Sequence, residues 1–116
     1  MNERMEQLPM IPLRGLHVFP DMVLNFDLER PLSIAAMNAA MDGDRRIYLL
    51  CQSDPEAEEP EESELFKVGT VAEIRQILRI PGGGVRVLVK GMYRAELRRV
   101  LEHIPYYRAE VREQEQ

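Results

Sequence analysis

A turn signal in the second half of the chain constrains the fold most strongly. Residues 81–84 read Pro-Gly-Gly-Gly, and glycine readily adopts the positive φ that a tight hairpin turn requires. The segment that follows has valine at every second position, Val85, Val87 and Val89, which is the period of a strand with one apolar face. The sequence therefore predicts a β-hairpin whose second strand covers 85–92.

The segment before the turn, 70–80, has two interpretations. Thr70 and Glu73 have the spacing of a helical capping box, and several apolar residues would share a helical face. We predict a strand, because the turn follows at once. As a strand, the segment places four apolar residues on one face: Ala72, Ile74, Leu78 and Ile80.

The first half of the chain contains a strand, a helix and a second strand. Residues 23–28 alternate between apolar and polar types, which predicts a half-buried strand. Pro31 suits the first turn of a helix, residues 32–41 are rich in alanine and methionine, and Gly43 stands where a left-handed cap would end that helix. The continuous apolar run in 46–51 predicts a buried strand.

The sequence predicts extended backbone near both ends of the chain. Pro9 and Pro12 exclude a helix interior, because proline lacks the N–H and its ring clashes with the preceding turn. They leave an edge strand or the entry to a loop. Residues 106–112 alternate again and predict a last strand.

Charge divides the chain into an acidic first part and a basic second part. Residues 1–66 carry 5 basic and 14 acidic side chains, whereas residues 67–112 carry 10 basic and 4 acidic ones. The segment 54–64 holds seven of the acidic side chains and two prolines, which predicts a mobile loop that does not pack. The basic excess fits a nucleic-acid surface or, as we prefer, the solvated faces of strands.

The sequence assembles no catalytic, cofactor-binding or metal-binding set. His17 and His103 have no partner at ligand spacing, and Cys51 lies in an apolar run where cysteine acts as a small hydrophobe. Gly82–Gly84 lacks the lysine of a phosphate-binding loop. A single cysteine, no secretory signal and no apolar run of about 20 residues together predict a cytoplasmic protein.

Several motifs, in order, resemble the N-terminal domain of Lon, the ATP-dependent protease family. The resemblance covers roughly residues 8–112. It rests on the proline-containing run 8–23 and on motifs that follow it: Arg30 and Ser33 at the start of the helix, Phe66-x-Val68-Gly69-Thr70-Val71, Pro81-x-Gly83, Val87-Leu88-Val89-x-Gly91, and Arg94-Ala95. It implies a mainly β PUA-like pseudobarrel of about six strands with one helix. It also favours a strand over 94–101, which propensity alone would allow to be a helix.

The same resemblance implies a domain division. Residues 1–7 would be a disordered N-terminus, 8–112 the Lon-type domain, and 113–116 the start of a tail that leads to an ATPase and a peptidase domain outside this chain. The parent would be an ATP-dependent serine endopeptidase that uses ATP and Mg. This chain alone would hold no cofactor and have no enzymatic activity.

Binding is the function that the resemblance implies. The domain would recognise unfolded or damaged polypeptides and support oligomer assembly of the full-length protein, with no membrane or nucleic acid as partner. Apolar and methionine side chains beside a Gly/Pro loop or on the helix are the candidates for contact with a polypeptide. They are Leu16, Phe19, Met22, Met37 and Met41. Core filling is the competing role for Met37 and Met41.

Three alternatives remain at this stage. The chain could be a stand-alone Lon-type interaction module without a protease. It could be a PUA-like RNA-binding domain, with a basic stacking surface. The side chains of that surface would be Arg86, Lys90, Tyr93, Arg94, Arg98, Arg99, Tyr106 and Tyr107. An independent small enzyme has the least support, because no acid–base or nucleophile set is present.

Overall fold

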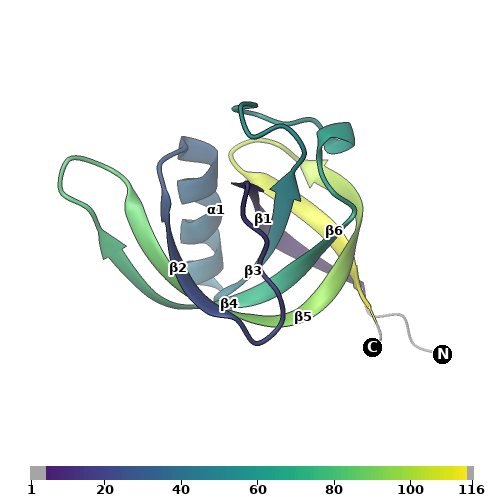
Figure 1. Ribbon diagram of the computed structural model, residues 1–116, viewed down its shortest axis with the longest axis horizontal. Helices are drawn as coiled ribbons and strands as arrows, with labels where there is room; N and C mark the ends of the chain where they lie inside the picture. The colour runs from purple at the N-terminus through teal and green to yellow at the C-terminus, as the bar shows by residue number, and fades with distance from the viewer. Residues whose placement is uncertain (1–4, 115–116) are drawn as a thin grey trace.

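The part of the chain that the structure describes contains six strands and one α-helix (Figure 1). The structure, a computed structural model, describes residues 5–114. In chain order the elements are β1 Met5–Arg14, β2 Val23–Leu28, α1 Pro31–Asp42, β3 Arg46–Gln52, the 3₁₀ turn η1 Glu62–Glu64, β4 Val68–Arg79, β5 Val85–Glu102 and β6 Tyr107–Glu113. The predicted mainly β fold, with one helix between the second and third strands, is confirmed.

Five of the strands close into a barrel. The strand order is β2-β5-β4-β3-β1-β6, and β5 pairs with β6 as well, so that β1, β3, β4, β5 and β6 form a closed ring. Closure gives each of those strands a neighbour on both sides over at least part of the ring. β2 stands outside the ring and pairs antiparallel with the first part of β5. In Figure 1 the turn between β4 and β5 projects past β2 and α1, beyond the barrel.

β3 separates two hydrophobic cores, which explains its continuous apolar run. Ile47 and Leu49 belong to the helix-side core, where the sheet packs against Ala36, Met37 and Ala40 of α1. The intervening Tyr48 and Leu50 belong to the barrel core. The other buried members of the barrel core are Leu8, Met10, Leu65, Val71, Ala95, Tyr107, Ala109 and Val111.

The two prolines of β1 each lie where the strand has a single neighbour. Met5–Met10 pairs with β6, and Met10–Arg14 pairs with β3. Each proline therefore keeps one open side, on which a missing N–H costs no ladder hydrogen bond. The prediction that residues 1–7 are disordered is wrong for residues 5–7, which lie in β1. Residues 1–4 are outside the described part of the chain.

The predicted face of β4 is wrong beyond its midpoint. The register against β5 shifts between Ile74 and Gln76, which is the signature of a β-bulge. One extra residue reverses the side-chain alternation, so Ile77 packs against the helix-side core. Leu78 is 61% exposed, although the simple alternation placed it with Ile74.

The end of α1 also differs from the prediction. Gly43 has φ −107° and is not a left-handed cap. The positive φ falls two residues later at Arg45, with φ 67°. The N–H groups of both residues donate to the Ala40 carbonyl oxygen, at 3.1 and 2.9 Å. These bonds satisfy a carbonyl group of the last turn that has no partner within the helix. None of the helices in residues 5–114 is long and apolar enough to cross a membrane.

The acidic segment 54–64 packs against the barrel, so the prediction of an unpacked loop is wrong. Pro60 is buried, and its carbonyl oxygen accepts a hydrogen bond from the Tyr107 hydroxyl at 2.8 Å. A Glu62 carboxylate oxygen accepts from the Val100 N–H at 2.8 Å. These contacts join the acidic segment to β5 and β6 despite its composition.

Candidate functional site

The loop 15–22, between β1 and β2, is fixed to the sheet by hydrogen bonds at its middle and at its end. The Thr70 hydroxyl of β4 donates to the Val18 carbonyl oxygen at 2.6 Å. The Gly91 N–H of β5 donates to the Met22 carbonyl oxygen at 2.8 Å. The loop therefore presents its side chains from a defined backbone rather than from a free segment.

Exposed rings gather where this loop meets the start of β4. The His17 ring stacks on Phe66 with centroids 5.4 Å apart and lies 6.4 Å from Phe19. The Arg94 guanidinium carbon lies 5.2 Å from the Phe19 ring centroid. Phe19 is 46% and Phe66 43% exposed, and the neighbouring Val68 is exposed as well. We call these five residues, His17, Phe19, Phe66, Val68 and Arg94, the aromatic surface.

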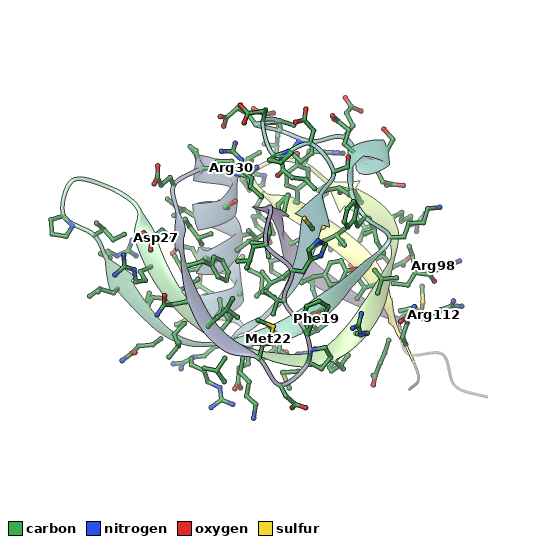
Figure 2. The ribbon with its side chains drawn as sticks, in the orientation of Figure 1. Phe19, Met22, Asp27, Arg30, Arg98 and Arg112 are labelled. Atoms are coloured by element: carbon green, nitrogen blue, oxygen red, sulfur yellow. The ribbon has the colours of Figure 1, made fainter. Side chains whose placement is uncertain are left out.

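The predicted binding residues divide between surface and core. Phe19 lies on the aromatic surface, and the Met22 sulfur beside it accepts a hydrogen bond from the Phe19 N–H at 3.3 Å (Figure 2). Leu16 is half-buried against the helix-side core, as is Met41. Met37 is fully buried, so its predicted contact with a polypeptide is wrong. The helix methionines fill the core of this protein.

Sequence reasoning missed His17, Phe66, Val68 and Arg94 as members of one site. The available signal was weak: Phe66 and Val68 follow an acidic segment at the start of a strand. Their approach to Phe19 requires β1 to pair with β3 and β3 to pair with β4. Arg94 arrives through the pairing of its backbone with Thr70. Such neighbours come from topology, not from spacing.

A hollow of about 260 Å³ lies between β1, β2 and the start of α1. Arg30 lies beside it and is engaged by the protein, because its guanidinium donates to the Gln52 side-chain oxygen at 2.9 Å and to the Pro12 carbonyl. Burial lowers the pKa of Arg30 from its usual value. Arg30 therefore serves to join α1 to β1 and β3.

Five arginines on β5 and β6 form ion pairs with carboxylates. Arg98 and Arg112 both contact Glu96, and in Figure 2 they lie at the opposite end of the molecule from Asp27. The other pairs are Arg86–Asp27, Arg99–Glu110 and Arg108–Glu102. Carboxylates thus compensate these five arginines, which do not form the stripe of uncompensated charge that phosphate backbones favour.

Two of the three tyrosines considered for stacking on bases are engaged as well, and the third, Tyr106, is partly buried against the helix-side core. Tyr107 is buried, and the Tyr93 hydroxyl hydrogen-bonds with both Glu6 and Arg46. Burial, and then the bond to Glu6, raise the pKa of Tyr93 to about 12. Within residues 5–114, no three His, Cys, Asp or Glu side chains are placed to hold a metal ion.

Comparisons with known proteins agree with this architecture. The family model described as the ATP-dependent protease La (LON) substrate-binding domain matches residues 7–116. The chain is 46% identical over 112 residues to a Lon protease of Syntrophomonas wolfei and 48% identical over 113 residues to one of Clostridium acetobutylicum. Both matches cover 97% of this chain, which spans only 14% of the length of either relative.

Two solved structures share the fold. The N-terminal domain of Mycobacterium avium complex Lon protease superposes with a TM-score of 0.76 at 24% identity, covering 96% of this chain and 56% of that one. A Lon N-terminal domain protein from Xanthomonas campestris gives 0.72 at 14% identity, covering 95% and 60%. With the family match over nearly the whole chain, the conclusion is that this protein belongs to the Lon substrate-binding domain family.

Proposed function

We propose that this chain recognises unfolded or damaged polypeptide segments for an ATP-dependent serine protease of the Lon type, and that the aromatic surface makes the contact. The observation that carries this proposal is the exposure of Phe19 and Phe66 on a loop and strand start that are fixed by the sheet. ATP hydrolysis with Mg, peptide cleavage and self-association would belong to the full-length protein.

The chemistry of the surface suits a polypeptide without structure. Folded proteins bury most of their large apolar side chains, whereas unfolded segments leave them accessible to a partner. Stacked and edge-on ring contacts add about 0.5–1.5 kcal/mol beyond the apolar area that they bury. Because the loop is already ordered by its bonds to Thr70 and Gly91, little conformational entropy is lost when a segment binds.

Affinity at one such surface is modest, and an oligomer would multiply it. Several copies of the surface in one assembly would hold a long unfolded chain at more than one point, which raises the effective concentration of the remaining sites. Supporting that assembly is the second part of the proposed function.

A binding titration with a permanently unfolded protein tests the proposal. The ligand is a reduced, carboxymethylated and fluorescently labelled polypeptide, and its anisotropy is followed against the chain and its variants. Loss of one ring from an apolar contact costs about 1–2 kcal/mol, so Phe19→Ser and Phe66→Ser should each weaken binding by about five- to thirtyfold. Leu78→Ser is the matched control, because Leu78 is also exposed but lies on the far part of β4.

The outcomes separate the candidates. Unchanged binding in the Phe19 and Phe66 variants would refute the proposed surface. Binding should also persist at high salt, because apolar contacts are not screened. The nucleic-acid alternative would be favoured by tight binding of single-stranded RNA without polypeptide binding. In that case the logarithm of the binding constant should fall with the logarithm of the salt concentration, with a slope of about −0.7 per neutralised phosphate.

A further inference from the structure

Arg94 differs from the other arginines around it. On β5 and β6, Arg98, Arg99, Arg108 and Arg112 each contact a glutamate within 3.4 Å. Arg94 has no carboxylate partner and no side-chain hydrogen bond among residues 5–114. Its neighbour in the loop, Asp21, is exposed and makes no ion pair with it.

The position of Arg94 is nevertheless defined. Its backbone pairs with Thr70, so its side chain leaves the same face of the sheet on which the loop 15–22 lies. Its guanidinium is over the Phe19 ring at 5.2 Å, and it lines a small hollow together with His17 and Val68. A guanidinium beside a ring keeps N–H donors at its edge, where they can meet the two oxygens of a carboxylate.

We infer that Arg94 gives the aromatic surface a preference for segments in which a large apolar residue stands next to a carboxylate. This inference rests on the proposed function and names its substrate class. The apolar side chain would pack on Phe19 and Phe66 while the adjacent carboxylate, from Asp, Glu or a chain terminus, accepts hydrogen bonds from the Arg94 guanidinium. Charge complementarity selects the occupant, because Arg94 is the cation on this surface for which residues 5–114 supply no carboxylate.

The competing role for Arg94 is to cover the Phe19 ring and nothing more. In that case its loss would weaken every ligand equally, since the ring contact is the same for all of them. A preference between two ligands that differ only in one carboxylate is therefore the property that separates the two roles.

The experiment compares four labelled peptides with one shared apolar sequence. Two contain Phe-Asp or Phe-Asn in the middle, and two end in Phe as a free carboxylate or as an amide. Each is titrated with the wild-type chain, Arg94→Gln, Arg79→Gln and Phe19→Ser. Arg79 is the charge control, because it is exposed at the opposite end of β4.

Wild-type protein should prefer Phe-Asp over Phe-Asn by about two- to fivefold, which corresponds to a solvent-exposed ion pair, and the preference should shrink at high salt. Arg94→Gln should abolish the preference and leave Phe-Asn affinity within about twofold, while Arg79→Gln should retain it. The terminal pair reports whether a chain terminus supplies the carboxylate as well as a side chain.

Two results would overturn the inference while the proposed function stands. One is a preference for the carboxylate that persists in Arg94→Gln. The other is an equal loss of affinity for Phe-Asp and Phe-Asn in that variant. If Phe19→Ser changes the affinity of none of the four peptides, the proposed function fails and the inference fails with it.

Discussion

The carbonyl oxygen of Phe19 lies directly over Gly91. A Cβ added at residue 91 would be 2.2 Å from that oxygen, far closer than the two atoms can approach. Gly91 also exchanges backbone hydrogen bonds with Asp21 and Met22, so this one position supports the whole second half of the loop 15–22. Glycine is required here by close approach of the backbone, and not by a positive φ.

Gly91→Ala should therefore displace the loop. We expect a loss of about 1–3 kcal/mol in the free energy of unfolding from the forced backbone shift, together with weaker binding of an unfolded polypeptide. Urea unfolding and the anisotropy titration check the two effects. Met92→Ala, next along β5 and exposed, should change stability little. A Gly91→Ala variant that matches wild type in both assays would contradict this account of the loop.

The hydroxyl group of Tyr107 connects the acidic segment to the barrel, and its removal should loosen that segment. Tyr107→Phe removes the hydrogen bond to the Pro60 carbonyl and leaves that buried acceptor without its partner. We expect a loss of about 1 kcal/mol and faster proteolysis within 54–64. Limited proteolysis followed by mass spectrometry measures this. Identical cleavage rates in the two proteins would mean that the segment is held by other contacts.

The bulge in β4 predicts that truncating two neighbouring side chains, Ile77 and Leu78, has very different effects on stability. Ile77→Ala should cost about 1–3 kcal/mol, because Ile77 packs against the helix-side core. Leu78→Ala should stay within about 0.5 kcal/mol, because Leu78 is 61% exposed. Chemical denaturation of both variants decides the matter, and the reverse order would place the strand in the simple alternating register.

Those two residues also show where sequence reasoning reaches its limit. The glycine-rich turn and the valine alternation identified 70–80 and 85–92 as strands, and the strand interpretation placed Ala72 and Ile74 on a buried face, as the structure has them. The face of Ile77 and Leu78 depends on one unpaired residue in β4, which is set by pairing with β5 and leaves no trace in the alternation of β4 itself. The prediction for the acidic segment 54–64 was wrong because it also depends on a contact that local sequence does not show: its partner Tyr107 is distant in sequence.

The candidate site was predictable only in part. Phe19 stands between a glycine and a proline, and such a loop favours exposure of an apolar side chain. Met37 on the helix could not be assigned from composition, because a methionine fills a core as readily as it contacts a partner. Phe66 and Arg94 join Phe19 only once the strand order β1-β3-β4-β5 is known.

Tyr93 should make stability fall at high pH. Burial and the bond to Glu6 raise its pKa from 10.0 to about 12 in the folded protein. The folded state therefore retains this proton more tightly than the unfolded state does. Its contribution is complete below pH 10 and is lost as the pH rises towards 12. The free energy of unfolding, measured by urea denaturation at several pH values from about 9 to 11.5, should decline less steeply for Tyr93→Phe than for wild type. Equal slopes would contradict this assignment.

The most direct test of the central claim is to locate where an unfolded polypeptide touches the domain. Amide chemical shifts of the isotopically labelled chain are followed by NMR during titration with the carboxymethylated polypeptide. The account predicts that the largest changes fall in the loop 15–22, at Phe66 and Val68, and at Arg94. Changes confined to the hollow between β1 and β2, or to the exposed far part of β4 around Leu78, would contradict it.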